Sequence, residues 1–299
     1  MRKTGYGIFL AVLAASLYAL NAPLSKLVLN YLPSTLTAGF LYLGAGVGMF
    51  LVGSIKSFIV KESKEEKLAR EDLPYTIAMI LLDVLAPILL LLGLSMTTPE
   101  NTSLLNNFEI VATAVIALCF FKEKISKRLW LGIILITLSC GILSFENILS
   151  LKFSIGSLFV VLASLCWGIE NNCTRKLSNK DPLQIVVVKG VCSGLTSIII
   201  GLGLGQKVME IWAVFVTLGI GFVAYGLSIF FYVYAQRILG ASRTSAYYAV
   251  APFIGVLLSL VIFKSIPTWS FFIALAFMAI GAWLCSKDEP ILKKKTTTK

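Results

Sequence analysis

Residues 73–95 read LPYTIAMILLDVLAPILLLLGLS, a continuous apolar run in which Asp83 is the one charged residue. About 20 apolar residues in a helix cross a hydrocarbon layer of roughly 30 Å. Lipid offers the backbone no hydrogen-bonding partner, so a helix that satisfies its own N–H and C=O groups is the expected structure. The run therefore predicts a transmembrane helix.

The same test, applied outward from this run, predicts an all-α membrane protein with ten transmembrane helices. The predicted spans cover residues 6–27, 34–58, 73–95, 101–121, 128–146, 154–174, 182–204, 209–235, 241–263 and 267–286. Composition agrees, because 58% of the residues are hydrophobic and 14% are charged, whereas a soluble domain has about 25% charged residues. A single soluble core cannot bury that much apolar surface.

The positive charges predict the orientation. If the N-terminus is cytoplasmic, 21 Lys and Arg residues fall on the cytoplasmic side and 4 on the other, while Lys189 lies within a span. This is the positive-inside pattern of a multi-pass protein of the cell (inner) membrane, with both termini cytoplasmic. The excess of 26 basic over 15 acidic residues therefore reflects contact with the bilayer, and nucleic acid is not an expected partner.

The two halves of the chain resemble each other. A shift of 149 residues aligns Val12-Leu13-Ala14 with Val161-Leu162-Ala163 and Pro33 with Pro182, and a shift of 142 aligns Thr102-Ser103 with Thr244-Ser245. We expect five-helix repeats at 1–149 and 150–287 and a cytoplasmic Lys-rich tail at 288–299. Five is an odd number, so the repeats are inverted, an architecture of secondary transporters that place the substrate site near the midplane.

Several stretches carry a family resemblance. Asn101 to Leu105 leads through a span to Phe121 to Ser126, Leu239 to Ala246 leads to Pro252, and Ala163 to Gly168 opens the second half. In order and spacing these stretches resemble the EamA family of the drug/metabolite transporter superfamily. The resemblance implies transport of an organic solute such as an amino acid, a sugar or another metabolite. One departure is Ser265, which stands where the second-half partner of Glu123 is expected.

Ionisable groups at lipid depth are costly and usually face a bundle interior or a wet cavity. Four such groups are Asp83, Glu109, Glu170 and Lys189. We expect Pro87 to open the helix locally and to place Asp83 beside a cavity, and we expect Asn106 to share a helical face with Glu109. The alternatives are hydrogen bonds between helices for the acids, and for Lys189 either neutralisation of an acid or contact with a substrate carboxylate.

Two further patterns suggest substrate contacts. Tyr18, Asn21 and Ser25 have the same spacing as Trp167, Glu170 and Thr174, so both stripes are candidates for the walls of a central cavity; packing is the alternative. Tyr225 and Tyr248 suit a cavity for an organic solute, or else anchor helix ends at the membrane interface. The substrate-binding candidates are Tyr18, Asn21, Asp83, Asn106, Glu109, Trp167, Glu170, Lys189, Tyr225 and Tyr248.

The favoured function is a secondary-active transporter of a small organic metabolite, preferably amino-acid-like, working by alternating access. Buried carboxyl groups can exchange protons near neutral pH, so Glu109 and Asp83 are the candidates for proton coupling. The alternative is an exporter of cationic or aromatic drugs, and the remote alternatives are a membrane-embedded enzyme or a channel. His is absent and no metal-ligand or nucleotide motif occurs, so we expect no enzymatic activity, no metal and no cofactor. The expected partners are the solute and the lipid bilayer, for a monomer or homodimer; the direction of transport stays open.

Overall fold

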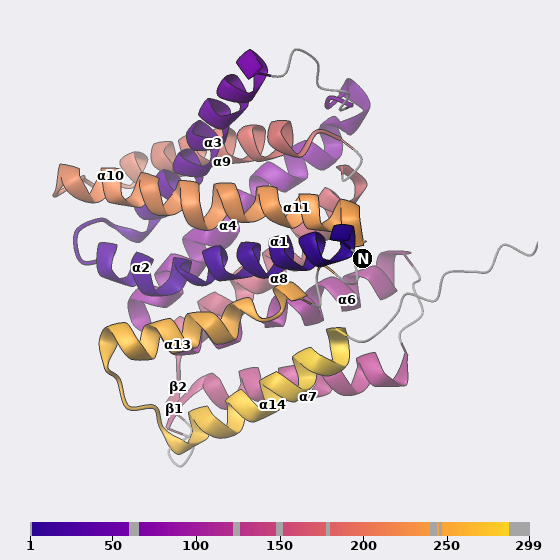
Figure 1. Ribbon diagram of the computed structural model, residues 1–299. Helices are drawn as coiled ribbons and strands as arrows, with labels where there is room; N and C mark the ends of the chain where they lie inside the picture. Colours follow the sequence, from indigo (N-terminus) through magenta and orange to yellow (C-terminus); the bar gives the residue numbers. More distant parts are fainter. Residues whose placement is uncertain are drawn as a thin grey trace, which may run out of the picture.

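The computed structural model describes residues 2–59, 66–121, 126–147, 152–177, 180–239, 244 and 247–286. The predicted boundary between the halves at residues 149 and 150, the predicted tail at 288–299 and Glu123 lie outside these described residues. Helices make up almost all of the described chain, which confirms the predicted all-α class apart from one short two-stranded sheet (Figure 1).

The helices follow one another with short connections. In the first half they are α1 (Arg2–Ala19), α2 (Asn21–Val28), α3 (Ser34–Ile59), η1 (Arg70–Asp72), α4 (Leu73–Met96), α5 (Pro99–Leu105), α6 (Phe108–Phe121) and α7 (Lys127–Leu143). The second half has α8 (Ile155–Leu177), α9 (Pro182–Gly203), α10 (Ile211–Ile220), the π-helix η2 (Gly221–Leu227), α11 (Ser228–Leu239), α13 (Ala251–Phe263) and α14 (Trp269–Ser286). Between the halves, β1 (Phe145–Asn147) pairs antiparallel with β2 (Lys152–Phe153).

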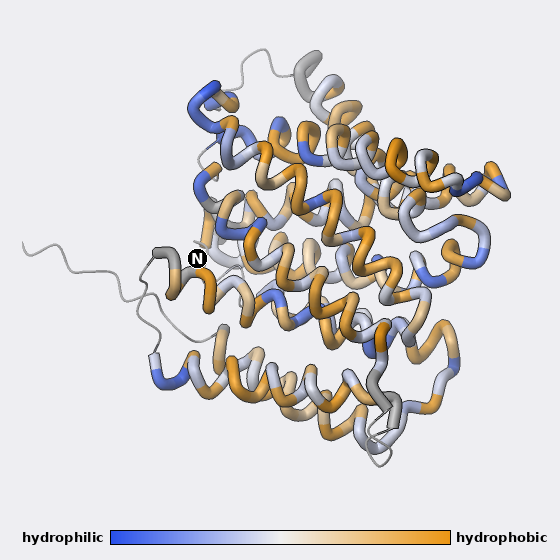
Figure 2. Tube along the Cα trace, turned by 180° about the vertical axis from the view of Figure 1, so that it is seen from behind, coloured by the Kyte–Doolittle hydropathy of each residue, from blue (hydrophilic) through white to orange (hydrophobic). Residues whose placement is uncertain are grey.

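Six helical segments in the described chain are long and apolar enough to cross a membrane. They are Thr4–Val28, Ser34–Ile55, Arg70–Met96, Ile155–Thr174, Pro182–Gly203 and Ile211–Ala235, and the shorter apolar helices are Ala251–Phe263 and Trp269–Cys285. Apolar side chains such as Ile199, Phe215 and Val261 are about 70% exposed on the outside of the bundle. Hydrophilic residues gather at the two ends of the helices (Figure 2). The chain is therefore a multi-pass membrane protein.

The helices lie side by side in antiparallel contact across the bundle (Figure 1). The main pairs are α3 with α9, α4 with α8, α7 with α14 and α1 with α11. Glycines allow two of these pairs to approach closely. A Cβ atom on Gly190 would lie 2.5 Å from the Cα of Gly46, and one on Gly132 would lie 2.9 Å from the carbonyl oxygen of Gly281. Small residues at crossings allow this close packing in membranes.

Two predicted spans are interrupted. The span at 6–27 breaks at Leu20 between α1 and α2, and the span at 101–121 breaks at Asn106 and Asn107 between α5 and α6. Asn side chains favour helix ends, because they compete for backbone hydrogen bonds. Asn106 and Glu109 lie on either side of this break, and the N–H of Glu109 donates a hydrogen bond of 3.1 Å to the carbonyl of Asn106.

Pro87 does not interrupt its helix. The helix α4 runs from Leu73 to Met96 with Pro87 inside it, so the expected local opening is absent. Proline removes a single i→i−4 hydrogen bond, and the helix continues through the turn that lacks it. Asp83 is consequently buried against neighbouring helices, as described next.

Candidate functional site

Lys189 on α9 joins two carboxylates from two other helices. Its Nζ lies 2.9 Å from Oδ2 of Asp83 on α4 and 3.0 Å from Oε1 of Glu170 on α8. The three residues are 8%, 0% and 3% exposed. We call Asp83, Glu170 and Lys189 the charge triad. The helix α4 packs on both α8 and α9, so three apolar helices each contribute one charge to the same point.

Two hydroxyl groups complete the charge triad. The hydroxyl of Tyr42 on α3 donates a hydrogen bond of 2.9 Å to Oδ1 of Asp83, and the hydroxyl of Thr174 donates to Oε1 of Glu170. Sequence reasoning missed Tyr42. The available signal was its position in the middle of the predicted span 34–58, since a buried tyrosine hydroxyl usually finds a polar partner.

Glu109, near the start of α6, differs from the acids of the charge triad. Its Oε1 accepts a hydrogen bond of 2.5 Å from Nδ2 of Asn171 on α8, and in the described part of the chain no cation lies within salt-bridge distance of it. Asn171 was also missed, although it follows Glu170 directly in a polar run within a predicted span. With all groups ionised, Asp83, Glu109 and Glu170 set three carboxylates against the one ammonium of Lys189, and such an imbalance is costly at low dielectric.

Tyrosines form a second cluster on the α1 side of the bundle. The ring of Tyr225 lies 5.8 Å from that of Tyr18 and 5.1 Å from that of Tyr42, and Tyr248 lies 5.9 Å from Tyr18. We call Tyr18, Tyr42, Tyr225 and Tyr248 the tyrosine cluster. Tyr42 belongs to it and also contacts Asp83, so the cluster and the charge triad adjoin.

Two asparagines hold the tyrosine cluster. Nδ2 of Asn21 donates to the hydroxyl of Tyr225 and Nδ2 of Asn106 to that of Tyr18, both at 2.9 Å. Trp167 is buried in the apolar core, and its side chain also forms a hydrogen bond with the hydroxyl of Tyr42. Of the stripe on α8, Glu170 joins the charge triad and Trp167 packs in the core.

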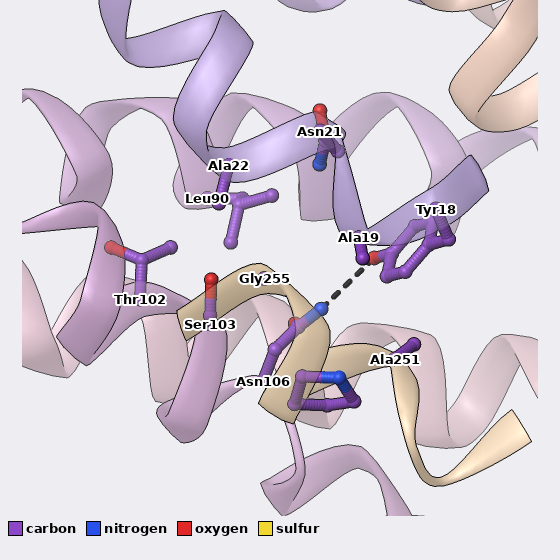
Figure 3. Close-up of a pocket in the computed structure, with 11 residues that line it drawn as sticks. Tyr18, Ala19, Asn21, Ala22, Leu90, Thr102, Ser103, Asn106, Ala251 and Gly255 are labelled. Carbon is purple, nitrogen blue, oxygen red and sulfur yellow. Dashed lines mark hydrogen bonds between the residues drawn. The ribbon is translucent and has the colours of Figure 1, made fainter. Parts of the chain in front are cut away.

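A small cavity lies beside the tyrosine cluster, between α1, α2, α4, α5 and α13 (Figure 3). Its volume is about 20 Å³, and Tyr18, Asn21 and Asn106 are among its lining residues. A space of this size accommodates one water-sized group. Neither the acids nor Lys189 line it, so the cavity and the charge triad are formed by different residues.

The family follows from a comparison of sequences. A model of the EamA-like transporter family matches residues 5–145 and, separately, residues 154–287. The chain belongs to the EamA-like transporter family. The resemblance found in the sequence is thereby confirmed, and this EamA-like chain is a multi-pass membrane protein of a transporter family whose surroundings are a lipid bilayer.

Individual relatives agree with this family. An "Uncharacterized transporter" of Methanothermobacter thermautotrophicus is 26% identical over 273 residues, covering 87% of this EamA-like chain and 80% of the relative. "Uncharacterized transporter YyaM" of Bacillus subtilis is 24% identical over 212 residues, covering 66% and 65% of the two chains. A crystal structure of another protein superposes with a TM-score of 0.67 at 14% identity, covering 95% of both chains, which shows a shared fold.

Proposed function

We propose that this chain is a secondary-active transporter of a small organic solute, works by alternating access and performs no catalysis. The observation that carries the proposal is the charge triad, which is buried at a junction of both predicted halves: Asp83 comes from the first half, and Glu170 and Lys189 come from the second. Charged groups at this depth usually mark substrate or ion pathways.

Two inverted repeats, each with five of ten membrane spans, are part of the proposal. The family model matches the two halves separately, which supports division at 1–149 and 150–287. Helix contacts support it too. The pair of α4 and α8 joins the third and sixth spans, and the pair of α1 and α11 joins the first and eighth, so exchanging the halves converts one pair into the other. A two-fold axis in the membrane plane has this effect.

In the proposed orientation the protein lies in the cell (inner) membrane, with both termini in the cytoplasm. Contacts between the segments that connect the spans support a topology in which successive connections alternate between the two sides of the bilayer. Lys180 pairs with Glu66, and both belong to connections predicted as cytoplasmic. Tyr31 packs on Trp212 with ring centroids 4.7 Å apart, and both lie near connections predicted for the other side. Every one of these contacts joins connections on a single predicted side of the bilayer.

An amino-acid-like solute suits the proposed site. A zwitterion carries a carboxylate that can pair with Lys189 and an ammonium that can pair with Glu109 or an acid of the charge triad. Glu109 and Asp83 are the proposed proton carriers, because a carboxyl group that releases its proton on one side and takes one up on the other couples transport to the proton gradient. The asparagines and tyrosines described above supply the remaining polar contacts.

The tyrosine cluster supports a second candidate, an exporter of cationic aromatic compounds. Aromatic faces bind organic cations, and Tyr42 places this cluster next to the carboxylate of Asp83. Such a solute would stack on the rings and pair with the acids, without need of Lys189.

Counterflow in liposomes distinguishes these possibilities. Purified protein is reconstituted with an unlabelled solute inside, and uptake of a labelled amino acid or of a labelled aromatic cation is measured. We expect saturable, stereoselective exchange of the amino acid that is lost in Lys189→Met. Exchange of the aromatic cation alone would favour the second candidate, and voltage-driven, non-saturable flux of either would refute a carrier.

A further inference from the structure

The small cavity in Figure 3 lies where two helix interruptions meet. The break at Leu20 separates α1 from α2, and the break at Asn106 separates α5 from α6. Residues on both sides of the first break line the cavity, together with Ser103 and Asn106 at the second break and Gly255 of α13. Interrupted helices in transporters expose backbone groups that bind ions or charged groups of a substrate, and this cavity has groups with free hydrogen-bonding capacity.

The carbonyl oxygen of Ala19 is one such group. In a continuous helix it would accept a hydrogen bond from the N–H of the residue four positions later, but that residue is Pro23, which has no N–H. Ala19 itself lines the cavity. The sequence thus leaves an oxygen acceptor without its usual helical donor at this point.

The hydroxyl of Ser103 is the second group. Ser103 is 6% exposed, and its hydroxyl has no hydrogen-bond partner among the described residues. Figure 3 shows it pointing toward the cavity from α5. A buried polar group without a partner is unfavourable, so the position favours a ligand that satisfies it.

Gly255 keeps these two oxygens accessible from one point. A Cβ atom on Gly255 would lie 2.9 Å from Oγ of Ser103 and 3.3 Å from the carbonyl oxygen of Ala19. Both oxygens therefore border the space that the missing side chain of Gly255 leaves open, so a small ligand in that space would lie near both of them. Any larger residue at position 255 would fill this place itself.

Asn106 adds a third oxygen. Its Nδ2 already donates to Tyr18, and its Oδ1 accepts only a long hydrogen bond of 3.4 Å from Ser164. Nδ2 of Asn21 is likewise engaged with Tyr225. Each of these amides keeps a second N–H, and the oxygens with remaining capacity at the cavity are those of Ala19, Ser103 and Asn106.

We propose that the carbonyl of Ala19, the hydroxyl of Ser103 and Oδ1 of Asn106 form a binding site for a small monovalent cation, either the primary ammonium group of the transported solute or Na⁺. Three oxygens match the three N–H donors of an ammonium group, and the cavity volume of about 20 Å³ fits one such group. Glu109 stands three residues beyond Asn106 on the next helix, and its carboxylate adds favourable charge. The ammonium alternative rests on the proposed function, whereas cation binding itself can be measured without transport.

The test is the thermal stability of the purified full-length chain in detergent, titrated with different chloride salts. A ligand that binds the folded state raises the midpoint temperature by mass action. We expect a saturable rise on the order of 5 °C with methylammonium if the site holds the ammonium group of a solute, or with NaCl if it holds Na⁺. Choline chloride at equal ionic strength is too large for the cavity and should give no saturable rise. Equal responses to all salts would overturn the proposal.

Variants assign the effect to this cavity. Gly255→Ala fills the site, and Ser103→Ala removes one oxygen, so both should abolish the saturable rise. The matched control is Gly141→Ala on α7, where a Cβ atom would meet nothing within 4 Å; it should respond as the unmodified chain does. If the saturable rise in midpoint temperature persists in Ser103→Ala, the proposed site is contradicted, even if Gly255→Ala fails to fold.

Pro23→Ala tests the backbone oxygen without removing any atom from the cavity. The new N–H at position 23 can hydrogen-bond to the carbonyl of Ala19, so the cation should bind about tenfold more weakly. An unchanged affinity would remove Ala19 from the site. Cation binding without solute exchange would refute the proposed transport function and leave the proposed cation site standing. Solute exchange without stabilisation by a cation would refute the cation site and leave the transport function standing.

Discussion

The ammonium of Lys189 and the carboxylate of Asp83 lie 2.9 Å apart although they come from different predicted halves of the chain. Both side chains are withdrawn from lipid and water, and Glu170 takes the other side of the same ammonium. The opposite charges next to each group offset the free-energy cost of burying it. The charge triad therefore connects the stability of this bundle with its proposed activity.

Removing the ammonium should destabilise the protein strongly. Lys189→Met leaves two buried carboxylates without a cation, and breaking a buried ion pair in this way typically costs about 3–5 kcal/mol. The triple variant Asp83→Asn, Glu170→Gln, Lys189→Met removes all three charges, so it should recover most of the stability and still fail to transport. Unfolding in detergent measures the stability of both variants, and counterflow measures their transport. If Lys189→Met is as stable as the unmodified chain, the expectation is contradicted.

Removing the hydroxyl of Tyr42 should have a smaller effect on stability. Tyr42→Phe keeps the ring in the tyrosine cluster and deletes the hydrogen bond to Asp83, and hydrogen bonds to charged groups contribute about 1.5–3 kcal/mol. Tyr6→Phe is the control, because Tyr6 is 58% exposed on the outside of α1. Thermal unfolding of both variants should rank Tyr42→Phe as clearly less stable.

Glu109→Gln should uncouple solute transport from the proton gradient. The new amide oxygen can still accept the hydrogen bond from Asn171, so folding should persist, but the side chain no longer binds and releases a proton. We expect counterflow to continue while a pH gradient ceases to drive accumulation. Glu210→Gln, at the N-cap of α10, is the control. Gradient-driven accumulation that survives in Glu109→Gln would exclude this residue as the proton carrier.

An ionic contact at the proposed cytoplasmic end should control local opening. Lys180 pairs with Glu66 and lies 3.5 Å from Asp72, while the N–H of Asp181 donates to the carbonyl of Glu66 at 2.8 Å. The hydrogen bond with Glu66 raises the pKa of Lys180 above its ordinary value of 10.5. The contact therefore contributes its stability at neutral pH and loses it only as the pH rises through that raised pKa.

Hydrogen exchange measures this opening. Lys180→Gln should accelerate exchange of the amides of residues 66–72 and 180–184, and 1 M NaCl, which reduces the screening length to about 3 Å, should do the same in the unmodified chain. Gln206, which contacts Thr35 and Leu36 through uncharged groups, provides the comparison at the other end. Faster exchange there as well would indicate general destabilisation rather than a local contact.

Adding a single methyl group should disturb the crossing of α3 and α9. Gly190→Ala forces a Cβ atom against the backbone of Gly46, and overpacking of this kind costs about 1–3 kcal/mol. Gly141→Ala, with open space around it, should be neutral or stabilising by up to about 1 kcal/mol, because Ala is the better helix former. Equal midpoint temperatures for the two variants would contradict the close crossing.

Sequence alone determined the class of this protein and the position of most helices. Apolar runs of span length, such as residues 73–95, leave few alternatives in lipid, since each helix satisfies its own backbone locally. The family resemblance was also present in the order of short motifs. The interruptions at Leu20 and Asn106 were not predicted, because a break within an apolar run depends on neighbouring helices that supply replacement contacts.

The candidate residues were found because charge is conspicuous at lipid depth, but their partners were not. Only the packing of the helices decided that Lys189 lies between Asp83 and Glu170 and that Tyr42 joins them. Helix periodicity indicates which residues share a face, whereas contacts between residues far apart in the chain arise from the crossing of whole helices. Tertiary structure therefore decided which charges neutralise one another, because Coulomb and hydrogen-bond energies depend on distances that no linear pattern contains.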